Sequence, residues 1–348
     1  DLRMSRGLGD VYKRQDHNPL DGTVRDEITF WNAKESALNT IKTQLASPNV
    51  SLILDLLKIS KRSHTAVALI SSLSVKDSLK VATVNNNFLK NLTINNVYSA
   101  ETISNLQLAI GDVFENFKKI KIIRYPIEKA VVLLRLITKD FESRLIDILS
   151  KYNLFQVDAN EFESILQQIE TQLDFFDNNV RAVINLLRGM LRKQENIFIP
   201  IKIETPNFIK ESMHEIKAIR NDHESFNISI MSLVDEFESA PDGQLPICQQ
   251  LYNESQVAYS SLSTLPLNKI FEKEGTYFNS HKTTYYQQIS FVERKLVNVI
   301  KSLLAVVSNE PSALFVIFRK FNFLLSKPQI RLMLQQYYTI LLNSTEKE

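Results

Sequence analysis

The sequence predicts an all-α protein, on the evidence of its glycine content and its apolar periodicity. The 348 residues include only 7 glycines, where average usage of about 7% would supply roughly 24. Folds rich in hairpins or phosphate-binding loops need more glycine than this. Apolar residues recur at steps of three and four along most of the chain, and no convincing strand pattern is present. We therefore expect a chain built from amphipathic helices, several of them long.

Five helices are expected before residue 150, over residues 26–45, 48–57, 75–92, 103–117 and 126–148. Pro48 and Pro126 suit a first helical turn, because the amide hydrogen that proline lacks has no partner there. Three consecutive asparagines, residues 85–87, lower the helix propensity of the third segment. Ser99 is placed to cap the fourth.

Six further helices are expected, over residues 158–196, 205–237, 251–262, 278–306, 314–325 and 330–342. Asp158 and Glu161 have the spacing of a capping box, and the helix that they open should be about 50 Å long. The apolar stripe that begins at Phe278 advances by near-heptad steps, which favours a partner helix along its whole length. Pro311 and Pro328 open the last two helices.

Changes in composition divide the chain into three parts. Residues 1–15 have neither an apolar stretch nor helical periodicity, and we expect them to be a disordered assembly scar outside the fold. The segment APDGQLP, residues 240–246, combines two prolines with a glycine. We expect helical bundles over residues 16–240 and further bundles over residues 241–348, continuing beyond this fragment.

Composition also excludes several classes of function. Lys and Arg total 41 against 39 Asp and Glu, and the net charge of +2 provides no global field for nucleic acid. The single cysteine, Cys248, cannot form an internal disulfide, which fits a reducing compartment. The longest strictly apolar run, Ala313 to Phe318, has six residues, whereas a membrane span needs about 20. We expect no nucleic-acid partner and no membrane insertion.

No motif for catalysis, cofactor binding or metal binding is present. The patterns GxxxxGK[ST], HExxH, CxxC and GxSxG are all absent from the sequence. His214 and His223 are separated by roughly 14 Å of helical rise, so they cannot share one metal ion within their helix. We interpret them as surface or packing residues, and Cys248 as a small core residue without a neighbouring base. The predicted sets of catalytic, cofactor-binding and metal-binding residues are therefore empty.

Two groups of residues could serve a partner, and each also has a structural interpretation. A basic cluster is the best surface for an acidic partner, although cations also suit the last turn of a helix; it comprises Lys58, Lys61, Arg62, Lys118, Lys119, Lys121 and Arg124. Trp31, Tyr285 and Tyr286 could anchor an interface or lie in the core. The acidic group Asp235, Glu236 and Glu238 could suggest general acid/base catalysis, but no glycine-rich or aromatic cleft accompanies it, and we interpret it as a solvated helix face.

Four stretches together resemble the N-terminal tail of cytoplasmic dynein heavy chains, in particular the fungal cytoplasmic dynein 1 type. They are DEITFWNAKESALNTIKTQLASPNVSLILDLLKISKR (Asp26 to Arg62), IRYPIEKAVVLLRLITKDF (Ile123 to Phe141), FEKEGTYFNSHKTTYYQQISFVERKL (Phe271 to Leu296) and IFRKFNFLLSKPQIRLMLQQYYTILL (Ile317 to Leu342). The last is the most specific, with its Phe-x-x-Phe spacing and its Pro-x-Ile-Arg sequence. Between residues 151 and 250 the resemblance is mainly one of helical pattern.

The resemblance implies an elongated rod of successive antiparallel helical bundles, a non-catalytic scaffold without cofactor. In that family the tail links the microtubule motor to the intermediate chain, the light intermediate chain, dynactin with its adaptor, and a second heavy chain. The resemblance further implies a cytoplasmic, microtubule-associated location, and residues after about Gly243 as the better region for the intermediate chain. Individual partner-binding residues are not predicted. The alternatives are a helical-rod subunit of a membrane-tethering complex and an enzyme with an unrecognised site.

Overall fold

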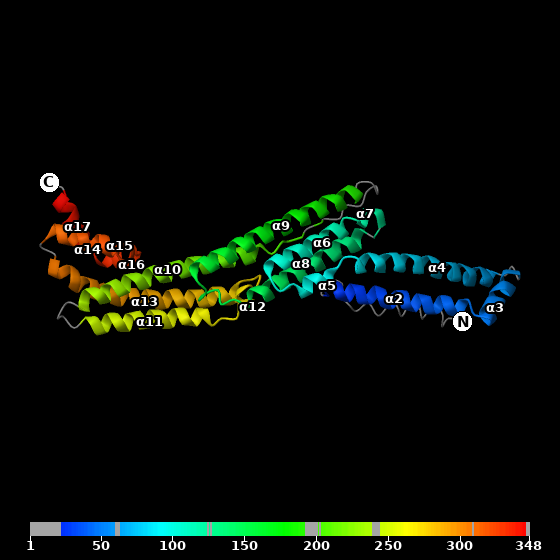
Figure 1. Ribbon diagram of the computed structural model, residues 1–348, viewed down its shortest axis with the longest axis horizontal. Helices are drawn as coiled ribbons and strands as arrows, with labels where there is room; N and C mark the ends of the chain where they lie inside the picture. Colours follow the sequence, from blue (N-terminus) through cyan, green and yellow to red (C-terminus); the bar gives the residue numbers. More distant parts are fainter. Residues whose placement is uncertain are drawn as a thin grey trace. The chain divides into compact units, whose positions relative to one another are not determined.

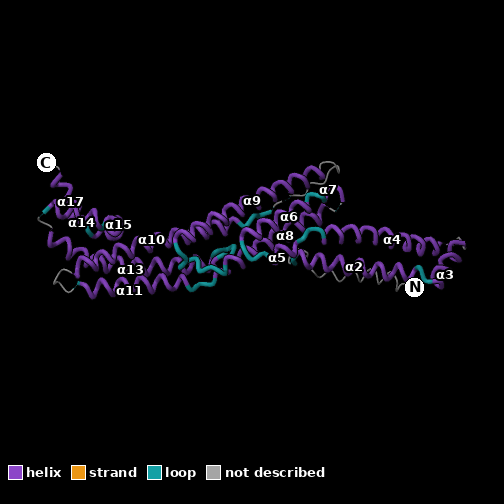
Figure 2. Tube along the Cα trace, in the orientation of Figure 1, coloured by secondary structure: helices purple, strands orange, loops and turns teal. Residues whose placement is uncertain are grey.

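The computed structural model describes residues 22–59, 63–123, 125, 127–191, 201, 203–238, 244–307 and 310–345. Within these ranges every regular element is a helix, which Figure 2 shows as purple segments joined by short teal loops. The all-α prediction is therefore confirmed. The segment predicted to be an assembly scar, residues 1–15, and the boundary predicted at residue 240 both lie outside the described residues.

The folded chain forms two compact units, each of which is described by itself. Unit 1 comprises residues 1–148 and 167–207, and unit 2 comprises residues 149–166 and 208–348. Helix α9 (Ala159–Leu191) contributes its first eight residues to unit 2 and the remainder to unit 1.

Unit 1 begins with two neighbouring helices joined by a shorter one. Helices α2 (Val24–Leu45) and α4 (Ser63–Lys90) lie side by side, with α3 (Pro48–Ile59) between them in sequence (Figure 1). Thr23 and Asp26 form a capping box at the start of α2, in which each side chain accepts a hydrogen bond from the other residue's backbone N–H. The other helices of the unit, besides its part of α9, are α5 (Ile94–Ser99), α6 (Ile103–Phe117), α7 (Ile120–Ile123) and α8 (Ile127–Leu149).

Three phenylalanines form the centre of the unit 1 core. The rings of Phe141 on α8 and Phe176 on α9 are stacked, with centroids 4.0 Å apart, and Phe114 on α6 meets Phe176 edge to face at 5.4 Å. All three side chains are fully buried. Aromatic pairs at these separations add to the free energy gained by burial, so this cluster ties α6, α8 and α9 together.

Two local predictions in unit 1 differ from the structure. Helix α4 begins at Ser63, before the predicted start at residue 75. Its asparagine run contacts α2, because Asn86 is buried and its Nδ2 donates to Asn32 Oδ1 at 2.9 Å and to the Glu35 carboxylate. Ser99 does not cap α6. Its hydroxyl donates to the Asn95 carbonyl within α5, and Thr102 accepts from the Asn105 N–H as the true N-cap.

Unit 2 is built around two long helices and their neighbours. Its helices are α10 (Asn207–Glu238), α11 (Leu245–Ser263), α12 (Leu267–Ile270), α13 (Thr276–Val307), α14 (Pro311–Lys320), α15 (Asn322–Ser326), α16 (Pro328–Met333) and α17 (Gln335–Thr345). Helices α11 and α13 run side by side over most of the length of α11 (Figure 1). The partner helix predicted for the stripe that begins at Phe278 is therefore present within the unit.

Polar contacts fix the turn that precedes α9 to the rest of unit 2. The Arg220 guanidinium donates to the carbonyls of Leu154 and Val157, each at 2.5 Å, and the Tyr259 hydroxyl donates to the Phe155 carbonyl at 2.7 Å. These bonds satisfy backbone carbonyls that a turn leaves without helical partners. The turn is consequently part of the packed unit.

The last two predicted helices are each divided in two. The backbone leaves helical geometry at Phe321 (φ −105°, ψ 24°) and at Leu334 (φ −106°, ψ 14°). Both side chains are fully buried. A break at a buried apolar residue lets the chain turn that residue into the core, so packing overrides the continuous helical pattern here.

Candidate functional site

The residues that sequence reasoning examined for catalysis have structural roles. His223 is 4% exposed and stacks on the Tyr259 ring, with centroids 3.9 Å apart, and burial lowers the pKa of its imidazole to about 4. Cys248 is fully buried in α11, and burial raises the pKa of its thiol. A buried, protonated thiol is a poor nucleophile. These two packing assignments are confirmed.

The structure describes only some of the predicted partner residues. Lys118 pairs with Glu115 at 2.6 Å, and Lys119 donates to Asn116 Oδ1 at 2.7 Å, so both contact their own helical segment. Trp31 is 3% exposed and Tyr285 is 2% exposed, which places both in the core. Of the other members of the basic cluster, Lys121 lies on α7. The structure does not describe the side chains of Lys58, Lys61, Arg62 and Arg124.

Neither a metal site nor a membrane-spanning helix is present in the described ranges. The histidines, cysteine and acidic residues there do not form any group of three or more that could hold a metal ion. No helix in these ranges has the length and apolar character that crossing a membrane requires.

The surface of unit 2 that is best suited to a partner is an open groove between α11 and α13, which we call the α11–α13 groove. The apolar stripe of α11 faces inward, with Cys248, Leu251 and Leu262 buried. The residues beside this stripe therefore form one wall of the groove, and the corresponding residues of α13 form the other. The groove has a volume of about 950 Å³, which is within the usual range for ligand sites.

Apolar side chains form the exposed centre of the groove. Val257 on α11 is 69% exposed and Phe291 on α13 is 52% exposed, and both line the groove. An exposed aromatic or aliphatic side chain in a concave surface is the usual form of an interface anchor. Five carboxamide side chains surround them and can donate and accept hydrogen bonds: Gln249, Gln250, Asn253, Gln287 and Gln288.

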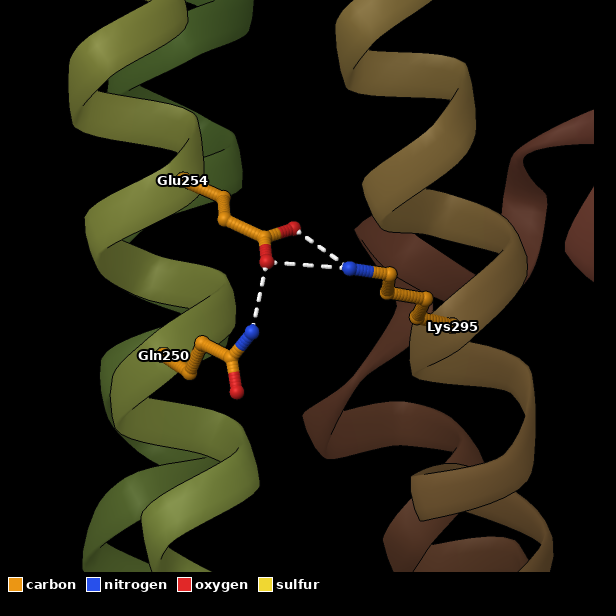
Figure 3. A network of polar contacts seen from close by, with 3 residues as sticks. All are labelled: Gln250, Glu254 and Lys295. Carbon is orange, nitrogen blue, oxygen red and sulfur yellow. Dashed lines mark hydrogen bonds and ion pairs between the residues drawn. The ribbon is translucent and has the colours of Figure 1, made fainter.

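A polar network joins the two walls of the groove. Lys295 Nζ on α13 donates to both carboxylate oxygens of Glu254 on α11 at 2.9 Å, and Gln250 Nε2 donates to Glu254 Oε1 at 2.8 Å (Figure 3). The hydrogen bond from Lys295 lowers the pKa of the Glu254 carboxyl. Both side chains of this ion pair are about a third exposed, so the pair sets the spacing of the helices more than it adds stability.

The positive charge of Arg294 lies outside this ion pair. The guanidinium of Arg294 lines the groove, donates to the Ser290 carbonyl at 3.4 Å and makes no ion pair with any residue that the structure describes. Because Glu254 and Lys295 compensate each other, the groove has one uncompensated positive charge. A partner helix with apolar anchors and an acidic residue is complementary to this surface.

The sequence contains a feature that indicates the groove but that helical periodicity alone does not reveal. Val257 and Phe291 lie off the buried stripes of their helices, so each is an apolar residue on a polar face. Sequence reasoning found neither, because the two positions are 34 residues apart and meet only when α11 packs on α13.

Comparison with known proteins gives a family match and several relatives. The family model described as dynein heavy chain, N-terminal region 1, matches residues 6–348. The chain is 25% identical to the cytoplasmic dynein heavy chain of Neurospora crassa over 97% of its length, and 24% identical to that of Drosophila melanogaster over 99%. It is 27% identical to that of Caenorhabditis elegans over 96%. The chain spans 8%, 8% and 7% of these three curated relatives, respectively.

Proposed function

Because the chain belongs to the dynein heavy chain N-terminal region 1 family, we propose that it is a tail segment that links a microtubule motor to accessory chains and cargo. The matched region is the N-terminal part of the heavy chain and is distinct from the motor domain, so this segment is non-catalytic. The family match does not favour the alternative of a membrane-tethering subunit.

The names of the relatives support the proposed setting. Several are cytoplasmic dynein heavy chains, so the proposed location is the cytoplasm, on microtubules through the whole motor. The proposed partners are the intermediate chain, the light intermediate chain, dynactin with its adaptor, and a second heavy chain. These partners are proposed for a whole heavy chain, and this chain spans 7–8% of the length of the curated relatives compared above.

Within this segment, we assign the intermediate chain to the α11–α13 groove. The groove lies after Gly243, in the region that the family resemblance favours for this partner. Its exposed Val257 and Phe291 both line the groove and offer apolar surface to the apolar face of an amphipathic helix. An acidic residue on that helix would complement the positive charge of Arg294.

The assignment is tested by binding of labelled intermediate chain to the purified 348-residue chain. We expect Phe291→Ser to weaken binding by about 2 kcal/mol or more, as for a central interface anchor. Ile228→Ser is the matched control, because Ile228 is 61% exposed on α10 and does not line the groove. Circular dichroism of each variant verifies that the helices are intact.

Two results would overturn the proposal at different levels. Equal losses for Phe291→Ser and Ile228→Ser would exclude the groove as the binding surface. No binding by the unmodified chain would exclude this segment as the place where the intermediate chain is held.

A further inference from the structure

A second concavity of unit 2 lies between α10 and α13, and it shares no lining residue with the α11–α13 groove. We call it the Asp222–Glu293 pocket. Its volume is about 90 Å³, enough for several water molecules at roughly 10–15 Å³ each. The side chains that matter to the argument are Asp222 and Phe226 on α10, Tyr285, Tyr286 and Glu293 on α13, and Lys327 just before α16.

The two carboxylates of the pocket have no partner in the described part of the chain. Glu293 is 8% exposed, and neither it nor Asp222 makes a hydrogen bond or an ion pair with a residue that the structure describes. Burial, reinforced by the charge of Asp222, raises the pKa of the Glu293 carboxyl, and Lys327 opposes this shift. The Glu293 side chain is thus mostly buried, while its carboxylate oxygens remain accessible from the pocket. A poorly hydrated carboxylate without a donor favours a positively charged group that enters the pocket from outside.

Lys327 does not supply that group. Its ammonium lies 4.6 Å from the centre of the Phe323 ring and forms no ion pair with Glu293. The pocket therefore has two carboxylates against one ammonium, and negative charge is in excess. The rings of Tyr285 and Tyr286 add π faces, which attract cations.

These features match the guanidinium group better than other cations. A guanidinium is planar, donates in a fork that suits carboxylates, and stacks on aromatic rings. The pocket offers carboxylates from two different helices and aromatic rings beside them within a volume that accepts a group of four heavy atoms. We propose that the Asp222–Glu293 pocket binds the guanidinium head of an arginine that a partner protein inserts between α10 and α13.

The proposal is tested with propylguanidinium as the probe and propylurea as its uncharged isostere. The purified 348-residue chain carries ¹³C-labelled tyrosine, and the signals of Tyr285 and Tyr286 are assigned with single Tyr→Phe variants. We expect saturable shifts of both signals with propylguanidinium and none with propylurea. Non-saturable shifts, or the same shifts with both compounds, would overturn the proposal.

Charge-neutral variants identify the carboxylates responsible. Glu293→Gln and Asp222→Asn should each weaken propylguanidinium binding by about tenfold or more, the loss expected for one charge-assisted hydrogen bond. Glu224→Gln is the matched control, because it removes the same charge from an exposed position on α10. Unchanged affinity in both pocket variants, or an equal loss in the control, would contradict the assignment. Neither result bears on the groove.

Discussion

At the scale of single residues, a few buried polar side chains determine how helices of unit 1 meet. Asp140 on α8 is 4% exposed. Its Oδ2 accepts from the Val24 N–H at 3.0 Å, at the start of α2, and from the Tyr98 hydroxyl of α5. Burial raises the pKa of the Asp140 carboxyl, and the two donors oppose that shift. One carboxylate thus connects three helices.

Asp140→Ala should destabilise the chain by about 2–3 kcal/mol, because it leaves the buried Val24 N–H and the half-buried Tyr98 hydroxyl without an acceptor. Chemical denaturation followed by circular dichroism measures the loss. Asp147→Ala is the control on the same helix, since the Asp147 side chain is 62% exposed and its ion pair with Arg144 is 3.7 Å long. It should cost about 1 kcal/mol or less. Similar losses for the two variants would show that the Asp140 contacts do not hold the helices.

Glu293 predicts a dependence of stability on pH. Its pKa is raised in the folded chain, so the folded state binds the proton more tightly than the unfolded state does. Ionisation therefore destabilises the fold above the folded-state pKa, and this cost disappears as the pH falls through that pKa towards the ordinary value of 4.5. At neutral pH the wild-type chain is therefore less stable than a variant with an uncharged side chain at position 293.

Glu293→Gln should accordingly raise the free energy of unfolding at neutral pH by on the order of 1 kcal/mol, and the gain should vanish below pH 4.5, the ordinary pKa of the carboxyl. Urea denaturation at several pH values measures this difference. Glu224→Gln on the exposed face of α10 should change stability by less than about 0.5 kcal/mol throughout. A gain for Glu293→Gln that grows on acidification would contradict the sign worked out above.

At the scale of elements, the long helices follow from their sequences and the short ones do not. Apolar steps of three and four are sufficient to predict α9, α10 and α13, because each of these helices buries one continuous stripe. The short α5, α7 and α12 have no stripe long enough to detect. The breaks at Phe321 and Leu334 depend on contacts with other helices, which periodicity within one segment does not contain.

The candidate site shows the same limit. The inward stripe of each wall was predictable, since the near-heptad stripe of α13 and the stripe of α11 are both visible in the sequence. Which outward residues face each other across the groove depends on the register between two helices, and a single sequence does not give that register. The Glu254–Lys295 pair and the facing positions of Val257 and Phe291 are consequences of it.

Phe321→Ala tests the packing of the final helices of unit 2. Phe321 is fully buried at the junction of α14 and α15, so truncation should cost about 3–5 kcal/mol through lost burial and the cavity left behind. Phe315→Ala on α14 is the control, because Phe315 is 60% exposed, and it should cost less than about 0.5 kcal/mol. Thermal and urea denaturation provide the comparison. A small loss at Phe321 would contradict the described packing.

At the scale of the whole molecule, the described chain presents surfaces that suit partners. His223 and Cys248 are buried in packing roles, and the family to which the chain belongs is the heavy-chain region outside the motor. Unit 2 carries both surfaces assigned above, the α11–α13 groove and the Asp222–Glu293 pocket. Their opposite excess charges suit different partner side chains, an acidic one in the groove and a basic one in the pocket.

We propose above that this segment is a scaffold whose α11–α13 groove receives the intermediate chain. Hydrogen–deuterium exchange of the 348-residue chain, alone and with the intermediate chain, is the sharpest test, because a helix seated in a groove slows local opening of both walls. We expect added protection in α11 and in the first two thirds of α13, with α2 and α4 of unit 1 unchanged. Protection confined to unit 1, or no change anywhere, would contradict it.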